Sequence, residues 1–155
     1  MRVLYDTNLI SYRWLGQSGY REPLRQLEHE LDNYGATRYV STISVQELQV
    51  CGRYLGNWDA WIEWVHARFA VVSFIEKHAN AAATLQVDVG HEGRGTKAER
   101  REAKDLWYRD AALMGTAIAA SFDMFATGDE GFRKYQAYFP GVIRIVEFDI
   151  QSTRR

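Results

Sequence analysis

The stretch that decides the fold is Arg2-Val3-Leu4-Tyr5-Asp6-Thr7-Asn8, at the start of the chain. Its apolar part, residues 2–5, is β-branched and aromatic, which predicts a short buried strand. Asp6 closes this strand. Residues 9–15 then predict a helix, and Gly16 is a plausible stop for it. The first unit of the chain is therefore a strand, an acid and a helix.

The alternation of strand and helix continues along the chain. Further strands are predicted at residues 39–43, 70–74, 124–126 and 142–146. Helices are predicted at residues 24–34, from Ser44 to near Gly52, at 58–69, 78–89 and 106–122, and briefly at 130–135. This alternation predicts right-handed crossovers and an α/β fold with a mainly parallel sheet of roughly five strands. We expect one domain over residues 1–155.

Composition excludes several classes of protein. The chain has 155 residues, of which 46% are apolar and 14% aromatic, and this is too apolar for a disordered chain. The formal net charge is −1, so any nucleic-acid contact must come from a local patch. A single cysteine, Cys51, excludes an internal disulfide and fits a reducing, cytoplasmic location. We expect no signal peptide, and residues 111–122 are too short an apolar stretch for a membrane span.

Four acidic residues lie at the ends of apolar runs: Asp6, Glu47, Asp110 and Asp129. Asp6 and Asp129 come just after the predicted first and fourth strands. Glu47 lies in the first turn of the helix after the second strand, and Asp110 starts the helix that leads into the fourth. Because the carboxyl ends of parallel strands share one edge, we expect all four carboxylates to point into one cleft.

Each acid also has a structural explanation when it is taken alone. Ser44 and Glu47 match a capping box, and Asp129 matches an N-cap. Asp110 would favour the positive end of a helix dipole, and Asp6 would form an Asx-turn. Caps alone do not explain why all four acids should converge.

Converging carboxylates need neutralisation, because mutual repulsion raises their pKa values and costs stability. Oxygen ligands suit Mg²⁺ or Mn²⁺, and no histidine or cysteine pattern in the sequence competes with them. A bound divalent ion can activate water against a phosphodiester. The pattern therefore predicts a metal-dependent enzyme.

Four short motifs, in this order, resemble those of the PIN-domain nucleases, and among them the VapC-like toxins of toxin–antitoxin pairs. The matching segments are Leu4-Tyr5-Asp6-Thr7-Asn8, Ser44-Val45-Gln46-Glu47-Leu48, Asp110-Ala111-Ala112 with residues 117–120, and Ala126-Thr127-Gly128-Asp129-Glu130-Gly131-Phe132. The resemblance covers nearly the whole chain.

The resemblance implies a three-layer α/β/α sandwich and a Mg²⁺-dependent endoribonuclease. Its catalytic, metal-binding acids would be Asp6, Glu47, Asp110 and Asp129. Asn8 and Thr127 match polar positions beside them. An RNA substrate, a homodimer and a cognate antitoxin protein are implied as partners.

Residues 90–104 depart from the compact members of this family. Three glutamates partly offset the charge of five basic residues in this segment. The basic residues are Arg94, Lys97, Arg100, Arg101 and Lys104. This segment is either a contact for RNA phosphates or a solvated charged loop. It also makes Asp105 a rival for the role of Asp110, which we prefer because the small-residue helix follows it directly.

A second cluster, at Trp58, Trp61 and Trp64, is not explained by the resemblance. Trp58 and Trp61 favour core or interface packing, whereas Trp64 is predicted to be the exposed one, open to base stacking. The sequence also allows two other functions. One is a non-catalytic PIN-like module that binds RNA or protein. The other is a phosphatase of the haloacid-dehalogenase type, for which Asp6-Thr7-Asn8-Leu9-Ile10 lacks the second acid and the threonine.

Overall fold

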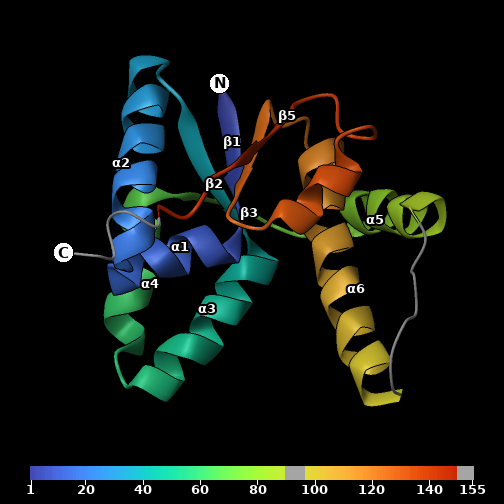
Figure 1. Cartoon of the computed structure of the whole chain (residues 1–155), viewed down its shortest axis with the longest axis horizontal. Helices are drawn as coiled ribbons and strands as arrows, with labels where there is room; N and C mark the ends of the chain where they lie inside the picture. Colours follow the sequence, from blue (N-terminus) through green and yellow to red (C-terminus); the bar gives the residue numbers. More distant parts are fainter. Residues whose placement is uncertain (90–96, 150–155) are drawn as a thin grey trace.

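The computed structural model describes residues 1–89 and 97–149, and of residues 97–103 it describes the backbone only. Within these residues one five-stranded sheet has the order β3-β2-β1-β4-β5 (Figure 1). Every neighbouring pair is parallel. The strands are β1 (Arg2–Tyr5), β2 (Thr37–Ser41), β3 (Ala70–Val72), β4 (Met124–Thr127) and β5 (Val142–Ile145). The predicted parallel α/β fold is confirmed.

Helices follow the strands along the chain. They are α1 (Thr7–Leu15), α2 (Ser18–Asn33), α3 (Thr42–Leu55), α4 (Trp58–Arg68), α5 (Glu76–Val89), α6 (Lys97–Ala119) and the 3₁₀ helix η1 (Glu130–Tyr135). The main difference from prediction is α6, which begins nine residues before the expected start at 106. None of the described helices combines the length and apolarity needed to cross a membrane.

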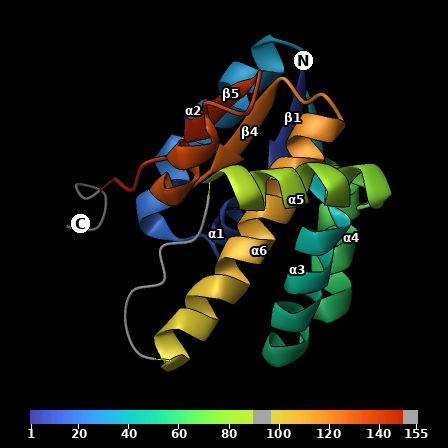
Figure 2. The same cartoon turned by 90° about the vertical axis from the view of Figure 1, so that its right-hand side faces the viewer.

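Two apolar clusters, one on each face of the sheet, make the three layers. Val3 and Tyr5 of β1 belong to one cluster, with α1, α2 and α4, whereas Leu4 belongs to the other, with α5, α6 and η1. This division follows from the strand period of two, which sends successive side chains to opposite faces. In Figure 1 the first group of helices lies to the left of the sheet, and Figure 2 looks onto the second.

The strand order reverses beside β1. From β1 the chain builds outward through β2 to β3, and then returns to the other side of β1 to add β4 and β5. In parallel α/β sheets ligands bind outside the carboxyl ends of the strands at such a reversal. The residues that follow β1 and β4 therefore occupy the favoured position, and the backbone N–H of Asp6 continues the pairing by donating to the Ala126 carbonyl at 2.9 Å.

The boundary between β2 and α3 differs from prediction. The strand ends at Ser41, and Ser41 is the N-cap, whose side chain accepts a hydrogen bond from the Ile43 N–H. The Thr42 hydroxyl accepts one from the Phe74 N–H at 2.9 Å, which ties the start of α3 to the end of β3. The predicted capping box is therefore wrong, because Ser44 lies inside the helix and is buried. Thr42 and Ile43 are β-branched and had suggested strand.

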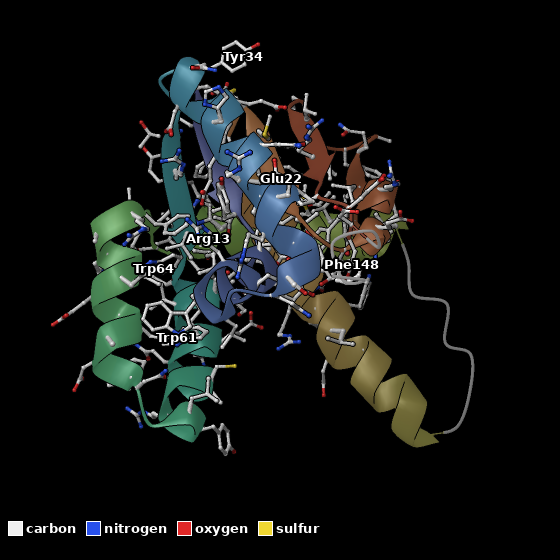
Figure 3. The ribbon with its side chains drawn as sticks, turned by 60° about the vertical axis from the view of Figure 1, so that its left-hand side comes forward. Arg13, Glu22, Tyr34, Trp61, Trp64 and Phe148 are labelled. Atoms are coloured by element: carbon white, nitrogen blue, oxygen red, sulfur yellow. The ribbon has the colours of Figure 1, made fainter. Side chains whose placement is uncertain are left out.

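The tryptophans near α4 pack inward. Trp61 is fully buried, and Figure 3 shows it pointing from α4 toward α1. Trp14 of α1 contacts both Trp61 and Trp64, with ring centroids 5.4 and 5.5 Å apart. The prediction that Trp64 is exposed is wrong, because Trp14 and Phe69 provide partners from α1 and from the end of α4.

The small residues of α6 allow a close crossing with α5. A Cβ added to Gly115 would lie 2.6 Å from the backbone nitrogen of Ala82 and 2.7 Å from the carbonyl oxygen of His78. Both neighbours are backbone atoms of α5, so neither can move aside without shifting the helix. The crossing matters for the acidic edge of the sheet because α6 also carries Asp110.

We expect Gly115→Ala to destabilise the protein by about 1–3 kcal/mol, the usual cost of overpacking. Helix propensity alone would predict that the substitution stabilises the protein, because alanine is favoured over glycine in a helix by about 1 kcal/mol. Urea unfolding followed by circular dichroism measures the change. Ala83→Gly on the exposed face of α5 is the control for propensity. A stabilised Gly115→Ala protein would contradict the close crossing.

Candidate active site

A cleft of about 300 Å³ opens at the carboxyl edge of the sheet. Its walls come from α1, α3, α6, η1 and the turn after β4. The lining residues are Asp6, Thr7, Asn8, Glu47, Leu106, Arg109, Asp110, Leu113, Asp129 and Phe132. The four acids predicted from the sequence thus share one cleft, although they are spread along the chain from position 6 to position 129.

Asp6 lies deepest in the cleft, with 6% of its surface exposed. It occupies the N-cap position of α1 but makes no capping bond with its side chain, so the predicted Asx-turn is wrong. Its Oδ2 instead accepts a hydrogen bond from the Thr127 hydroxyl at 2.6 Å. Burial, and to a lesser extent the charge of Asp110, raise the pKa of the Asp6 carboxyl from 3.8 to about 7, against the lowering effect of the Thr127 bond.

Asn8 and Thr127 join the ends of β1 and β4. The Asn8 Oδ1 accepts a hydrogen bond from the Gly128 N–H at 3.2 Å. The Thr127 hydroxyl, besides donating to Asp6, accepts one from the Asp129 N–H at 3.0 Å. Both residues therefore support the acids. Asn8 also lines the cleft, whereas Thr127 is fully buried and does not.

Glu47 reaches the cleft from the second turn of α3. Its Oε2 accepts a hydrogen bond from the Thr7 hydroxyl at 2.5 Å, and its Oε1 pairs with Nη1 of Arg109 at 2.6 Å. Glu47 thus bridges α1 and α6 instead of bonding back to the start of its own helix. It is held out of the first turn because α3 starts at Thr42.

Asp110 lies in the interior of α6, not at its start as predicted. Burial, and to a lesser extent the charge of Asp129, raise the pKa of its carboxyl to about 6. Lys134, whose Nζ lies 3.8 Å from Oδ2, opposes this shift. The rival residue, Asp105, is exposed and is absent from the cleft lining. Five residues along a helix correspond to a different face, which explains the separation.

Asp129 combines the structural and the site positions. As predicted for an N-cap, its Oδ1 accepts a hydrogen bond from the Gly131 N–H at 2.7 Å and begins η1. The same side chain lines the cleft. The capping bond fixes one oxygen and thereby the direction of the carboxylate.

The donor set suits a hard divalent ion, since every candidate ligand in the cleft is an oxygen. Two of the carboxyls have pKa values raised by burial and, to a lesser extent, by the neighbouring acids. However, in the part of the chain that the structure describes, no three His, Cys, Asp or Glu side chains lie close enough together to hold a metal as they stand. The acids therefore fit a metal only after their side chains turn toward one another.

Two basic residues near the acids were not predicted from the sequence. Arg109 pairs with Glu47, and Lys134 lies beside Asp110. The only signal for Arg109 in the sequence is its position directly before Asp110. Contacts between side chains of different helices leave no local sequence pattern. The predicted basic segment is only partly described. Arg94 lies outside the described residues, as do the side chains of Lys97, Arg100 and Arg101, and Lys104 is exposed with its Nζ 5.5 Å from the Tyr108 ring centroid.

Several solved structures have a fold similar to that of this chain. No family model and no curated protein matches the sequence. Among solved structures, the chain is similar to one in VapBC2 of Rickettsia felis bound to a promoter DNA fragment, at 17% identity and a TM-score of 0.67, covering 96% of this chain and 100% of that one. A chain in a toxin–antitoxin complex of Klebsiella pneumoniae is similar at 15% identity and a TM-score of 0.64. The match covers 96% of this chain and 99% of that one.

A third similar structure is FitAcB of Neisseria gonorrhoeae, at 20% identity and a TM-score of 0.62, covering 99% of both chains. Similarity at such low identity is evidence of a shared fold. The chain therefore has the PIN-like fold of the VapC structures, which confirms the fold implied by the resemblance, including its three-layer sandwich.

The raised pKa of Asp6 predicts a pH dependence of stability in the metal-free protein. A carboxyl with a folded pKa of about 7 and an ordinary one of 3.8 contributes stability that is present below pH 4 and lost as the pH rises through 7. Asp6→Asn removes this loss, so its stability advantage over wild type should grow by up to roughly 4 kcal/mol between pH 4 and pH 8.

Thermal melts of both proteins in EDTA across this range measure the difference. Addition of Mg²⁺ should narrow it, because an ion that binds only the folded state stabilises wild type. Parallel curves for the two proteins would contradict a buried, poorly neutralised Asp6.

Proposed function

We propose that this protein is a Mg²⁺-dependent endoribonuclease that acts as the toxin of a toxin–antitoxin pair. The observation that carries the proposal is the shared cleft of Asp6, Glu47, Asp110 and Asp129 at the strand-order reversal of the sheet. Four carboxylates in one cleft repel one another and cost stability, and function is the usual reason for such an arrangement.

The chain's own residues would prepare this cleft for a cation and a phosphodiester. Three of the acids each have one oxygen held by a hydrogen bond, which limits the directions available to their carboxylates. Thr127 donates to Asp6, Thr7 to Glu47, and the Gly131 N–H to Asp129. A divalent ion held by the four acids would supply activation of the attacking water and neutralise charge on the leaving oxygen. Mn²⁺ has the same ligand preference and would replace Mg²⁺.

An RNA substrate has to approach a negatively charged cleft. Cationic side chains at its border would offset the repulsion, and phosphate contacts supply affinity that does not depend on sequence. Arg109 lines the cleft and Lys134 lies next to Asp110. We extend the same role to the basic residues of the segment before Asp110: Arg94, Lys97, Arg100, Arg101 and Lys104.

The toxin role is supported by the similar structures, which are described as VapBC, FitAcB and toxin–antitoxin complexes. We propose a cognate antitoxin and a homodimer as protein partners, in a single domain acting in the cytoplasm. Exposed apolar side chains near the end of α3 agree with a protein partner: Val50, Tyr54 and Leu55.

A second candidate is a PIN-like module that binds RNA or protein without cleavage. The pairing of Arg109 with Glu47 favours it, together with the lack, in the described residues, of three acids close enough to hold an ion. The retention of all four acids favours catalysis. Metal dependence of cleavage separates the two.

For catalysis, we expect labelled RNA to be cleaved with Mg²⁺ and not with EDTA. Asp6→Asn and Asp129→Asn should each lower the cleavage rate at least about 100-fold, since the loss of a ligand should exceed the cost of losing a supporting residue. Asp105→Asn, one helical face away from the cleft, is the matched control and should cleave as wild type does. Cleavage that persists in EDTA and in Asp6→Asn would refute the assignment of this chain as a metal-dependent ribonuclease. It would favour a contaminating nuclease and a binding module.

For the toxin role, we expect induced expression of the wild-type chain to arrest growth of a bacterial host. Asp6→Asn expressed to the same level should not, because the arrest requires cleavage. Growth curves and immunoblots measure both quantities. Equal arrest by the two proteins would separate toxicity from the acidic cleft.

A further inference from the structure

A guanidinium group occupies the acidic cleft. Nη1 of Arg109 lies 2.6 Å from Oε1 of Glu47, while the other oxygen of the same carboxylate accepts the hydrogen bond of Thr7. Both oxygens of Glu47 are thereby engaged by the protein itself. Arg109 comes from α6 and Glu47 from α3, so the ion pair joins the two helices on opposite sides of the cleft.

This ion pair competes with any divalent ion at Glu47. Metal ligation at about 2.0–2.1 Å would bring the ion into the space that the guanidinium faces. Two cations at contact distance in a partly buried cleft repel each other. A cation can therefore reach Glu47 only if Arg109 moves away.

Arg109 is able to move. Its side chain is 51% exposed, compared with 23% for Glu47, so it lies at the open side of the pair. The Thr7 hydrogen bond keeps Glu47 in place when Arg109 leaves. A guanidinium that leaves one carboxylate in this cleft remains at the border, where a phosphate group would meet it, and its planar fork matches phosphate oxygens.

We infer that Arg109 is an exchange residue, which neutralises Glu47 in the free protein and binds a phosphate of the RNA backbone when a divalent ion takes its place. The inference rests on the proposed function, which it extends to a substrate-contacting residue. Metal binding and substrate binding would then be coupled, since the ion releases the side chain that the RNA needs.

Lys134 does not have the same position. Its Nζ lies 3.8 Å from Asp110, beyond the distance of a hydrogen-bonded pair, and 4.9 Å from the ring centroid of Tyr135 on its own helix. It is also absent from the residues that line the cleft. Arg109 is therefore the cation placed for exchange.

The first test measures metal binding directly. Mn²⁺ is titrated into metal-free protein and the free ion is followed by electron paramagnetic resonance. Arg109→Gln should bind Mn²⁺ about 2- to 5-fold more tightly than wild type, the range expected from the loss of one exposed ion pair. Arg13→Gln is the matched control, because Arg13 (Figure 3) pairs with Glu28 on the surface at a similar exposure of 48% and lies outside the cleft lining. It should leave Mn²⁺ binding unchanged.

The second test measures RNA binding. Fluorescence anisotropy of a labelled, mixed-sequence single-stranded RNA is recorded against salt in Mg²⁺. The RNA carries a phosphorothioate backbone, which resists cleavage, so that every acid of the cleft is kept. Arg109→Gln should weaken binding and reduce the slope of log K against log salt by about 0.7, the value for one phosphate contact with a single strand. Arg109→Lys should restore the slope but not the full affinity, because lysine keeps the charge and loses the fork.

Melting temperatures of all variants identify any that fail to fold. If Arg109→Gln does not fold, Arg109→Ala, which also removes the charge, replaces it in both measurements. The inference requires both readouts, so unchanged Mn²⁺ affinity or an unchanged salt slope in Arg109→Gln overturns it. Failure of the proposed function looks different. In that case wild type and Asp6→Asn would bind Mn²⁺ equally, whatever residue stands at position 109.

Discussion

The hydrogen bond from Thr127 to Asp6 depends on the reversal of strand order between β1 and β4. The two residues are separated by 121 positions, yet their oxygens lie 2.6 Å apart because the two strands are neighbours in the sheet. Around this bond the other polar contacts follow, from Asn8 to Gly128 and from Asp129 to Thr127. The parallel pairing of β1 with β4 is thus the constraint on which the acidic cleft depends, since it brings two strand ends and their acids to one point.

Electrostatic repulsion is the second constraint, and the fold meets it in two ways. Asp6 and Asp110 have raised pKa values because they are buried in acidic surroundings, so protonation can relieve part of their charge. Glu47 and Asp110 have basic neighbours in Arg109 and Lys134. The free protein therefore supplies its own cations to a cleft whose chemistry suits an added one. This arrangement accounts for a donor set that fits Mg²⁺ while the acids stay apart.

Most elements were predictable because their signals are local. Residues 2–5 form β1 as expected, since a short β-branched and aromatic run suits a buried strand, and Asp129 caps η1 as its position suggested. The failures occurred where two local signals competed. Thr42 and Ile43 looked like strand, but the capping bond of Ser41 starts a helix there. Trp64 looked exposed by helical periodicity, but Trp14 of another helix packs against it and leaves it half-buried.

By itself the sequence determined the alternation of strands and helices, and the placement of an acid after β1 and after β4. Hydrophobic periodicity and strand length control these features, and both are properties of neighbouring residues. Only the tertiary structure decided which groups meet those acids. The contacts of Arg109 with Glu47, of Lys134 with Asp110 and of Thr7 with Glu47 depend on strand order and on the direction of α6. The separation of the acids was equally a tertiary outcome, because each carboxylate is held by a partner of its own in the protein.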